Sequence, residues 1–254
     1  MELRVALCQT DMERGAVAGN LQRAEEAVAA AGADLTVLPE TFASGFAARP
    51  QRAADSADRI VEWMRRTARR YGTALAGSVV VRSGERFVNR LYFVRPTGGT
   101  EWYDKRHLFS IGGEGECFAA GDRRVVVEYG GVRWLLLICY DLRFPVWCRC
   151  RDDYDAILCA ASWPASRREA WRTLLRARAI ENQAYVVGVN RTGDDPPTHY
   201  AGDSAVVDFM GRTLCEAGSA ACVRTVAIDS GAPSRFRAEF PVRRDADDFR
   251  LSVR

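Results

Sequence analysis

The order of helical and strand patterns along the chain is the feature that most restricts its fold. In the first third, strands predicted over 3–10 and 34–38 alternate with amphipathic helices predicted over 20–31 and 55–71. The pattern then changes to strand pairs joined by glycine-containing turns, with one more helix predicted over 166–182. Helices mixed with hairpins, without a linker or a repeat, predict one α/β domain of two sheets flanked by helices.

The length of 254 residues fits one large domain with a full hydrophobic core. A glycine-rich loop is predicted over 105–122 and a polar tail after residue 229. The remaining strands are predicted over 73–82, 86–95, 125–129, 132–138, 155–160, 184–190, 204–209, 213–216 and 223–229.

The basic residues are almost all of one type. Of 36 basic residues, 35 are arginine and one, Lys105, is lysine. Against 33 acidic residues they leave a net charge of only +3, and the arginines are scattered along the chain. A nucleic-acid-binding protein is expected to have a dominant basic face, so this class is disfavoured.

Neither a membrane span nor a signal peptide is expected. The longest apolar runs, such as Leu135–Cys139, are far shorter than the ~20 residues that a membrane-spanning helix needs. With eight cysteines in a chain of this size, reduced thiols and a cytoplasmic location are expected. No Cys-x-x-Cys occurs and only two histidines are present, so no metal site is predicted.

Polar side chains stand out where apolar strands end. Glu40 follows the strand 34–38 and Pro39, where poor solvation would make a carboxylate a usable base. The alternative is a surface glutamate that begins a loop. Lys105 suggests a position where a planar guanidinium cannot replace a compact ammonium group. The alternative is the chance survival of one lysine.

Cys139 directly follows the apolar strand 132–138 and precedes a turn and a short helix predicted from Pro145. Backbone dipoles at such a position are expected to lower the pKa of the thiol and to favour the thiolate. Backbone N–H groups just after the cysteine could bind an oxyanion. The alternative is a buried structural cysteine, which is the interpretation given to Cys8 and Cys159.

Together, Glu40, Lys105 and Cys139 resemble the Glu-Lys-Cys triad of the nitrilase (carbon–nitrogen hydrolase) superfamily. The resemblance covers nearly the whole chain and includes the segments Leu38–Phe42, Tyr103–Phe109, Cys139–Pro145, Trp163-Pro164 and Arg176–Gln183. Phe240-Pro241 and Asp245–Asp247 resemble the omega-amidase branch more narrowly. Members of that branch hydrolyse the terminal amide of small carboxylic acid amides such as 2-oxoglutaramate or succinamate.

The resemblance implies an α-β-β-α sandwich of two mixed sheets flanked by helices, formed as a single domain over residues 1–254. It also implies a homodimer with helices and the C-terminal tail, about residues 230–254, at the interface. A second glutamate is implied near the nucleophile. Glu114 fits by position, and Glu116 competes because the glycines around both make the alignment of this loop ambiguous. The implied partner is a small-molecule amide, and no metal or organic cofactor is implied.

In the implied mechanism, Glu40 takes the proton of Cys139 and the sulfur attacks the amide carbonyl. Lys105 and the backbone N–H of Tyr140 stabilise the oxyanion. Ammonia leaves a thioester, and Glu40, helped by Glu114, activates the water that releases the acid.

The carboxylate of such a substrate needs a cation. Arg143 and Arg167 follow the strands that end at Cys139 and Trp163, and a guanidinium binds a carboxylate with two hydrogen bonds. Either arginine could instead lie on a solvated face or in a structural ion pair. Trp163, Phe42 and Phe118 are candidates for the pocket wall, although aromatic residues of this kind more often belong to the core.

Other functions stay open at this stage. A cysteine protease would need a histidine base, for which His107, close to Lys105, is the candidate. The Gly-x-Ser-x-Gly motif of serine hydrolases is absent. A non-catalytic binding protein of the same fold, or a hydrolase of nitriles or N-carbamoyl compounds, is also compatible with the sequence.

Overall fold

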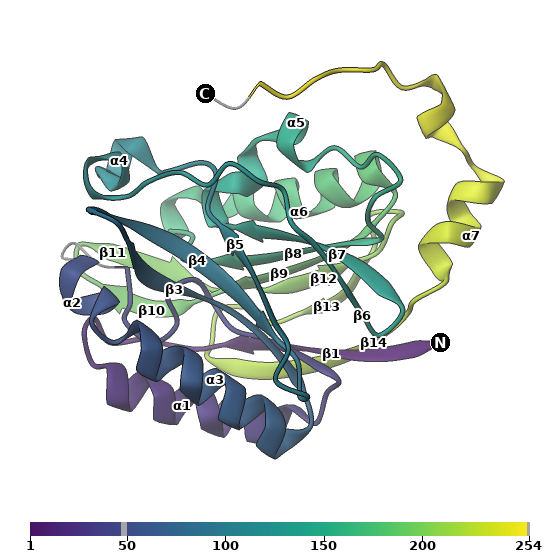
Figure 1. Ribbon diagram of the computed structural model, residues 1–254. Coiled ribbons are helices and arrows are strands. Elements are labelled where there is room, and N and C mark those ends of the chain that lie inside the picture. Colours follow the sequence, from purple (N-terminus) through teal and green to yellow (C-terminus); the bar gives the residue numbers. More distant parts are fainter. Residues whose placement is uncertain (47–49, 253–254) are drawn as a thin grey trace.

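Two six-stranded β-sheets lie face to face at the centre of the protein (Figure 1). The computed structural model describes residues 1–46 and 50–252. The first sheet has the strand order β14 (Cys222–Asp229), β1 (Glu2–Gln9), β2 (Leu35–Val37), β3 (Ala74–Ser83), β4 (Arg86–Val94), β5 (Thr100–Asp104). The second has the order β13 (Thr213–Glu216), β12 (Ala205–Val207), β9 (Tyr185–Asn190), β8 (Ala156–Ala161), β7 (Val132–Ile138), β6 (Val126–Tyr129).

Both sheets are mixed, with parallel strands in the middle. The strands β1, β2 and β3 pair in parallel in the first sheet, as do β7, β8 and β9 in the second. The outer neighbours pair antiparallel. Polar residues at the carboxyl ends of parallel strands commonly form the functional site of an α/β protein.

Helices cover the outer face of each sheet (Figure 1). The helices α1 (Val17–Ala31) and α3 (Ala57–Tyr71) pack on the first sheet through an apolar layer that includes Leu21, Met64 and Leu75. The helix α6 (Arg168–Asn182) packs on the second sheet and lies so close to β9 that a Cβ at Gly188 would be 2.5 Å from the side chain of Leu175. The predicted α/β fold of two mixed sheets flanked by helices is confirmed.

The hydrophobic core is divided between the layers by strand periodicity. In β1, Leu3, Val5 and Leu7 face the second sheet, whereas Cys8 faces the helices. The strand β7 contributes Trp134 and its apolar neighbours to the largest core cluster, which also includes Trp171 and Leu175 of α6. Strands that are apolar on both faces, as these are, need a covering layer on each side.

Several elements differ from the sequence-based expectations. The helix α1 begins at Val17 rather than Asn20, because the Asn20 side chain is buried and donates to the backbone oxygens of Glu13 and Ala43 instead of capping a helix. The helix α6 begins at Arg168, after a 3₁₀ helix η3 (Ala165–Arg167). The elements that were not predicted include α2 (Pro50–Ala54), β5, the hairpin strands β10 (Thr192–Asp195) and β11 (Thr198–Ala201), and α7 (Ala232–Glu239).

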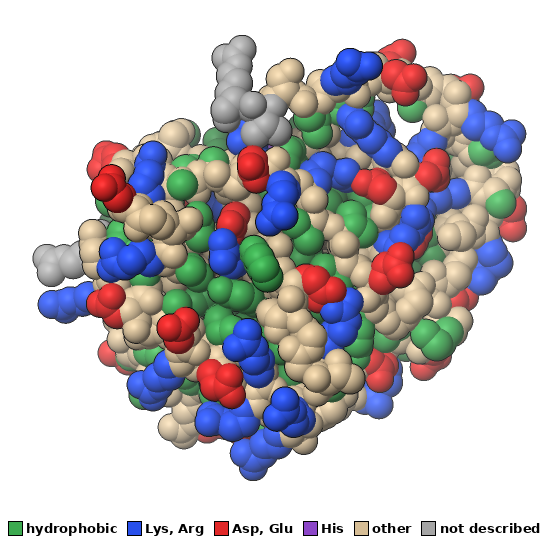
Figure 2. Space-filling model, in the orientation of Figure 1, with side chains coloured by type: hydrophobic (Ala, Val, Ile, Leu, Met, Phe, Trp, Pro, Cys, Tyr) green, Lys and Arg blue, Asp and Glu red, His purple; other side chains and the backbone are tan. Residues whose placement is uncertain are grey.

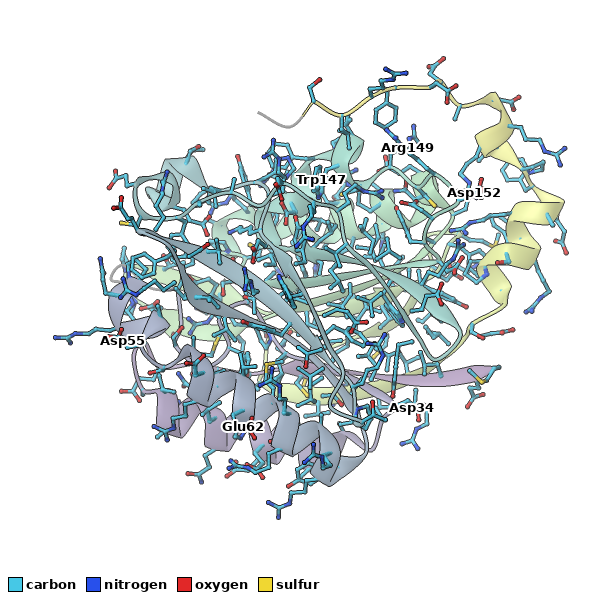
Figure 3. All side chains as sticks on the ribbon, in the orientation of Figure 1. Asp34, Asp55, Glu62, Trp147, Arg149 and Asp152 are labelled. Carbon is cyan, nitrogen blue, oxygen red and sulfur yellow. The ribbon has the colours of Figure 1, made fainter. Side chains whose placement is uncertain are left out.

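The C-terminal segment runs along the outside of the molecule after α7 (Figure 1). Figure 3 shows Trp147 and Arg149 on the side of the molecule along which this segment passes, whereas Asp55 and Glu62 lie at the opposite side, near α2 and α3. Leu251 and Trp147 line one shallow pocket, so the end of the described chain returns to the body of the fold.

The surface carries charges of both signs. Figure 2 shows basic and acidic side chains interspersed on one face, as the net charge of +3 leads one to expect. Within residues 1–46 and 50–252, no helix combines the length and the apolar character that crossing a membrane requires. All eight cysteines are free thiols.

Candidate active site

A cavity of about 210 Å³ opens where parallel strands of both sheets end. Its lining includes Glu40 from the segment after β2, Cys139 from the end of β7, and Ser162 from the end of β8. Lys105, the residue after β5, lines it as well. The structure thus brings together Glu40, Lys105 and Cys139, which were singled out in the sequence and are spread over 99 positions.

Cys139 is held in an unusual backbone conformation. It is the first residue of the 3₁₀ helix η2 (Cys139–Arg143), and its φ of 46° lies in the left-handed region. A non-glycine residue with positive φ is uncommon, and such residues cluster at functional sites. The side chain is partly accessible, unlike the fully buried thiols of Cys8 and Cys159. The sharp turn after β7 therefore presents the sulfur at the edge of the sheet.

Glu40 is buried, with 1% of its surface exposed, and its carboxylate accepts hydrogen bonds at both oxygens. Oε1 accepts from Nζ of Lys105 at 3.0 Å and from Nδ2 of Asn89 at 2.8 Å. Oε2 accepts from the backbone N–H of Ser162 at 2.9 Å. Since Ser162 directly follows β8 of the second sheet, this hydrogen bond joins the segments after β2 and β8 at the cavity.

Lys105 is clamped between two carboxylates. Its Nζ donates to Glu40 and also to Oε1 and Oε2 of Glu114, at 3.0 and 2.9 Å. Glu114 begins the short helix α4 (Glu114–Cys117) and is buried, and its Oε2 accepts from the backbone N–H of Phe109 at 2.6 Å. Glu116 is exposed. Of the two alternatives that the sequence left open, Glu114 is the one in contact with the lysine.

Burial and charge set the protonation states in this cluster. Burial alone would lower the pKa of Lys105, but the carboxylates of Glu40 and Glu114 outweigh it, so the pKa is raised and the ammonium persists. Burial raises the pKa of the Cys139 thiol well above its usual range, the Glu40 carboxylate raises it further, and Lys105 opposes the rise. The predicted thiolate is therefore wrong for the resting site, because desolvation and a nearby carboxylate outweigh backbone dipoles.

Aromatic and cationic side chains form the wall of the cavity. The guanidinium of Arg143 lies over the ring of Trp163 at 4.7 Å, and that of Arg167 over the ring of Phe109 at 5.2 Å. Tyr140 also lines the cavity, and its ring meets that of Phe109 edge-on at 5.2 Å. Within the part of the chain that the structure describes, no carboxylate lies within 4.0 Å of either guanidinium. Both cations are therefore available to a bound anion.

Two aromatic residues proposed for the wall belong to the core instead. Phe42 packs against Trp63 of α3 with ring centroids 5.7 Å apart, on the helix side of the first sheet. Phe118 packs against Phe87 of β4 at 6.4 Å. Both side chains are buried, and neither lines the cavity.

The comparison with known proteins decides the family. The sequence pattern of the carbon-nitrogen hydrolase family matches residues 4–237. The chain belongs to the carbon–nitrogen hydrolase family. This confirms the resemblance seen in the sequence, and the protein is a hydrolase that acts on carbon–nitrogen bonds.

Similar proteins from three organisms cover nearly all of this hydrolase. Omega-amidase YafV of Escherichia coli (strain K12) is 46% identical over 222 residues, which are 87% of each chain. A 2-oxoglutaramate amidase of Bacillus subtilis (strain 168) is 34% identical over 261 residues, which are 100% of each chain. The crystal structure of a CN-hydrolase superfamily protein from Xanthomonas campestris, with an arsenic adduct in its active site, has a TM-score of 0.92 and 42% identity, covering 99% of this chain and 100% of that one.

The hydrolase also contains a buried carboxylate that the sequence analysis missed. Asp141 accepts hydrogen bonds from the hydroxyl of Tyr103 at 2.8 Å, the backbone N–H of His107 at 2.9 Å and that of Ile138 at 3.0 Å. It therefore ties the segment that carries Lys105 to the turn that carries the thiol. Its position two residues after Cys139, inside an apolar run, was the available signal.

His107 does not occupy the position of a base. Its Nδ1 lies 2.8 Å from Asp141, and its ring stacks on Phe144 with centroids 3.7 Å apart. It does not line the cavity that contains Cys139. The arrangement of a Cys-His protease is therefore not found here.

Proposed function

We propose that this hydrolase is an omega-amidase, which cleaves the terminal amide of a small carboxylic acid amide to the acid and ammonia. The observation that carries the proposal is one cavity that combines a thiol at Cys139, the buried contacts of Lys105 with Glu40 and Glu114, and unpaired guanidinium groups. Its volume of about 210 Å³ lies below the ~300–1,000 Å³ of pockets for drug-sized ligands. The names of the bacterial relatives support the same substrate class.

The first step is the attack of Cys139 on the amide carbonyl. The buried cluster already carries one net negative charge, from Glu40 and Glu114 against Lys105. A thiolate formed in advance would add a second negative charge, which the raised pKa of the thiol disfavours. The thiol proton therefore passes to Glu40 as the carbon–sulfur bond forms, and the negative charge moves to the substrate oxygen.

Lys105 and the backbone N–H of Tyr140 stabilise this oxyanion. The ammonium is held by carboxylates on two sides before substrate binds, so little reorganisation is needed when the charge develops. Glu40 then returns its proton to the leaving nitrogen, ammonia departs, and the acyl group remains on Cys139 as a thioester.

The second half of the reaction transfers the acyl group to water. Glu40 removes a proton from the water as its oxygen attacks the thioester, and the proton returns to the sulfur of Cys139 when the acid leaves. Glu114 assists by fixing Lys105, to which both of its oxygens are hydrogen-bonded. The chain's own residues supply every proton transfer in this scheme.

The substrate carboxylate binds at the arginines of the cavity wall. Arg143 and Arg167 line the cavity, and each is oriented by stacking on an aromatic ring. A guanidinium recognises a carboxylate with two parallel hydrogen bonds. Trp163 supports Arg143 and, through its indole N–H, donates to the backbone oxygen of Arg167 at 2.8 Å.

A panel of substrates tests the proposal. Ammonia release is measured with 2-oxoglutaramate, succinamate, glutaramate, an uncharged amide of equal length, a nitrile and an N-carbamoyl amino acid. We expect the acidic amides to have the highest kcat/KM, and Cys139→Ala to release no ammonia. A preference for the nitrile or the N-carbamoyl compound would assign a different reaction. Binding of acidic amides without turnover would indicate a non-catalytic protein.

We also propose that the chain forms one domain and acts as a homodimer in the cytoplasm, with residues 230–254 at the interface. Ile180 of α6 is 55% exposed, Phe240 is 58% exposed, and Met210 and Leu214 are exposed as well. Exposed apolar side chains on α6, on and just before β13, and in the C-terminal segment support a surface that a second copy covers. Light scattering after size-exclusion chromatography should give twice the monomer mass. Ile180→Glu should reduce the measured mass to that of the monomer.

A further inference from the structure

The hairpin of β10 and β11 forms one wall of the cavity. Thr198 and Tyr200 are two residues apart on β11, so their side chains lie on the same face of the strand, and both line the cavity. His199, between them, lies on the other face, where it is exposed and contacts Asp194 at 2.7 Å. The mechanism proposed above uses neither hydroxyl.

Both hydroxyls lack a protein partner. Among residues 1–46 and 50–252, neither Thr198 nor Tyr200 has a side-chain hydrogen bond, although Tyr200 is only 5% exposed. The buried polar groups beside them are different, because Glu40 and Lys105 have several partners each. Neither hydroxyl oxygen is among the fully enclosed polar atoms that lack a partner in the described chain, so both are accessible from the cavity. A hydroxyl that faces a cavity without a protein partner can hydrogen-bond a bound molecule.

The ring of Tyr200 is fixed from behind. The guanidinium of Arg191 lies 4.3 Å from its centroid, is fully buried, and donates to the backbone oxygen of Met12 at 2.8 Å. Burial raises the pKa of Tyr200 to about 12, so the hydroxyl keeps its proton at neutral pH and can donate it. The cavity therefore offers a pre-oriented hydrogen-bond donor.

The position of the hairpin indicates which part of a substrate it meets. The strand β11 packs against η3, the turn that ends at Arg167. Thr198 and Tyr200 thus line the cavity beside the turn that carries Arg167, and Tyr200 is also near enough to Glu40 and Cys139 for their charges to raise its pKa. In a 2-oxo acid monoamide, the carbon that bears the oxo oxygen is bonded directly to the carboxylate carbon. A donor beside a carboxylate-binding cation is therefore placed for that oxygen.

We propose that Tyr200, assisted by Thr198, is a specificity-determining residue that donates a hydrogen bond to the 2-oxo oxygen of a 2-oxo acid monoamide. This inference rests on the proposed function and narrows its substrate class. A 2-oxo oxygen has two lone pairs and can accept from both hydroxyls. A substrate with a methylene group at this position offers neither hydroxyl an acceptor and displaces the water around them, and a site built for a polar group discriminates against such an analogue.

The test compares two substrates that differ only in this oxygen, 2-oxoglutaramate and glutaramate. Tyr200→Phe keeps the ring on Arg191 and removes only the hydroxyl. We expect it to lower kcat/KM for 2-oxoglutaramate about tenfold and to leave glutaramate unchanged, with Thr198→Val acting in the same direction. His199→Gln, on the outer face of the same strand, is the matched control and should leave both values unchanged.

Other outcomes overturn the inference. If Tyr200→Phe lowers kcat for both substrates equally, the hydroxyl acts on the reacting centre, and if it raises KM equally for both, it binds the shared carboxylate. Calorimetry of the products with the wild-type protein gives a readout without turnover. The inference requires 2-oxoglutarate to bind more tightly than glutarate, and Tyr200→Phe to remove the difference. If the wild-type protein releases no ammonia from either amide, the proposed function fails together with the inference.

Discussion

The variant Lys105→Arg separates the effect of side-chain shape on catalysis from the effect of side-chain charge. The Nζ atom lies 2.9 to 3.0 Å from three carboxylate oxygens, and the side chain is 1% exposed. Arginine keeps the positive charge, but its broad planar head cannot occupy the position of a compact ammonium between Glu40 and Glu114. A displacement of ~1 Å costs about 10²-fold in rate, and loss of one oxyanion donor costs ~10²–10³-fold in kcat, or about 2.7–4 kcal/mol.

We therefore expect Lys105→Arg to lower kcat for ammonia release by at least ~10²-fold. Its overpacking should also cost about 1–3 kcal/mol of folding free energy, measured by urea unfolding. Arg123→Lys, at a side chain that is 71% exposed, is the matched control for exchange between the two cations and should leave both values unchanged. Activity of Lys105→Arg within threefold of wild type would refute the reasoning, and Lys105 would then be a lysine by chance.

Three further predictions follow from the cavity. Glu114→Gln should lower kcat by ~10-fold or more because Lys105 loses an ionic partner, while Glu116→Gln, at an exposed position, should match wild type in the same ammonia assay; equal loss in both would contradict the assignment. Glu40→Gln should lower ammonia release by at least ~10²-fold. The same change removes a charge that raises the pKa of Cys139, so iodoacetamide should alkylate the thiol faster at neutral pH; an unchanged rate would show that burial alone sets its reactivity, and a slower rate would show that Glu40 promotes the thiolate. Arg143→Gln should raise KM for succinamate about tenfold without affecting an uncharged amide, and an unchanged KM would remove this residue from the carboxylate site.

The sequence predicts the fold well where periodicity is clear. The alternation in β1 and the helical spacing in α3 identify elements that the structure contains at nearly the predicted positions. The hairpin of β10 and β11 was missed because Thr192–Asp195 is polar and lacks the alternating pattern of a half-buried strand. The C-terminal helix α7 was missed because its segment contains few apolar residues.

Local sequence was less informative about the contacts within the site. Glu40 and Cys139 could be singled out because each follows a predicted strand, and Lys105 because it is the one lysine of the chain; the structure gathers all three in one cavity. The sequence could not choose between Glu114 and Glu116, since both lie in a four-residue helix among glycines and only the fold buries one of them. The pKa of the thiol was predicted in the wrong direction because burial and the approach of Glu40 depend on tertiary structure.

The hydrogen bond between Glu40 and the backbone of Ser162 makes the rate of turnover depend on how the two sheets pack against each other. Glu40 and Lys105 come from the first sheet and Cys139 from the second, so neither half of the chain holds a complete set of reacting groups. If the chain were divided in the loop between β5 and β6, each fragment would be inactive. Activity would return only when the two fragments reassociate in the native arrangement. The same geometry makes the rate of ammonia release sensitive to substitutions deep in the layer between the sheets, far from any substrate atom.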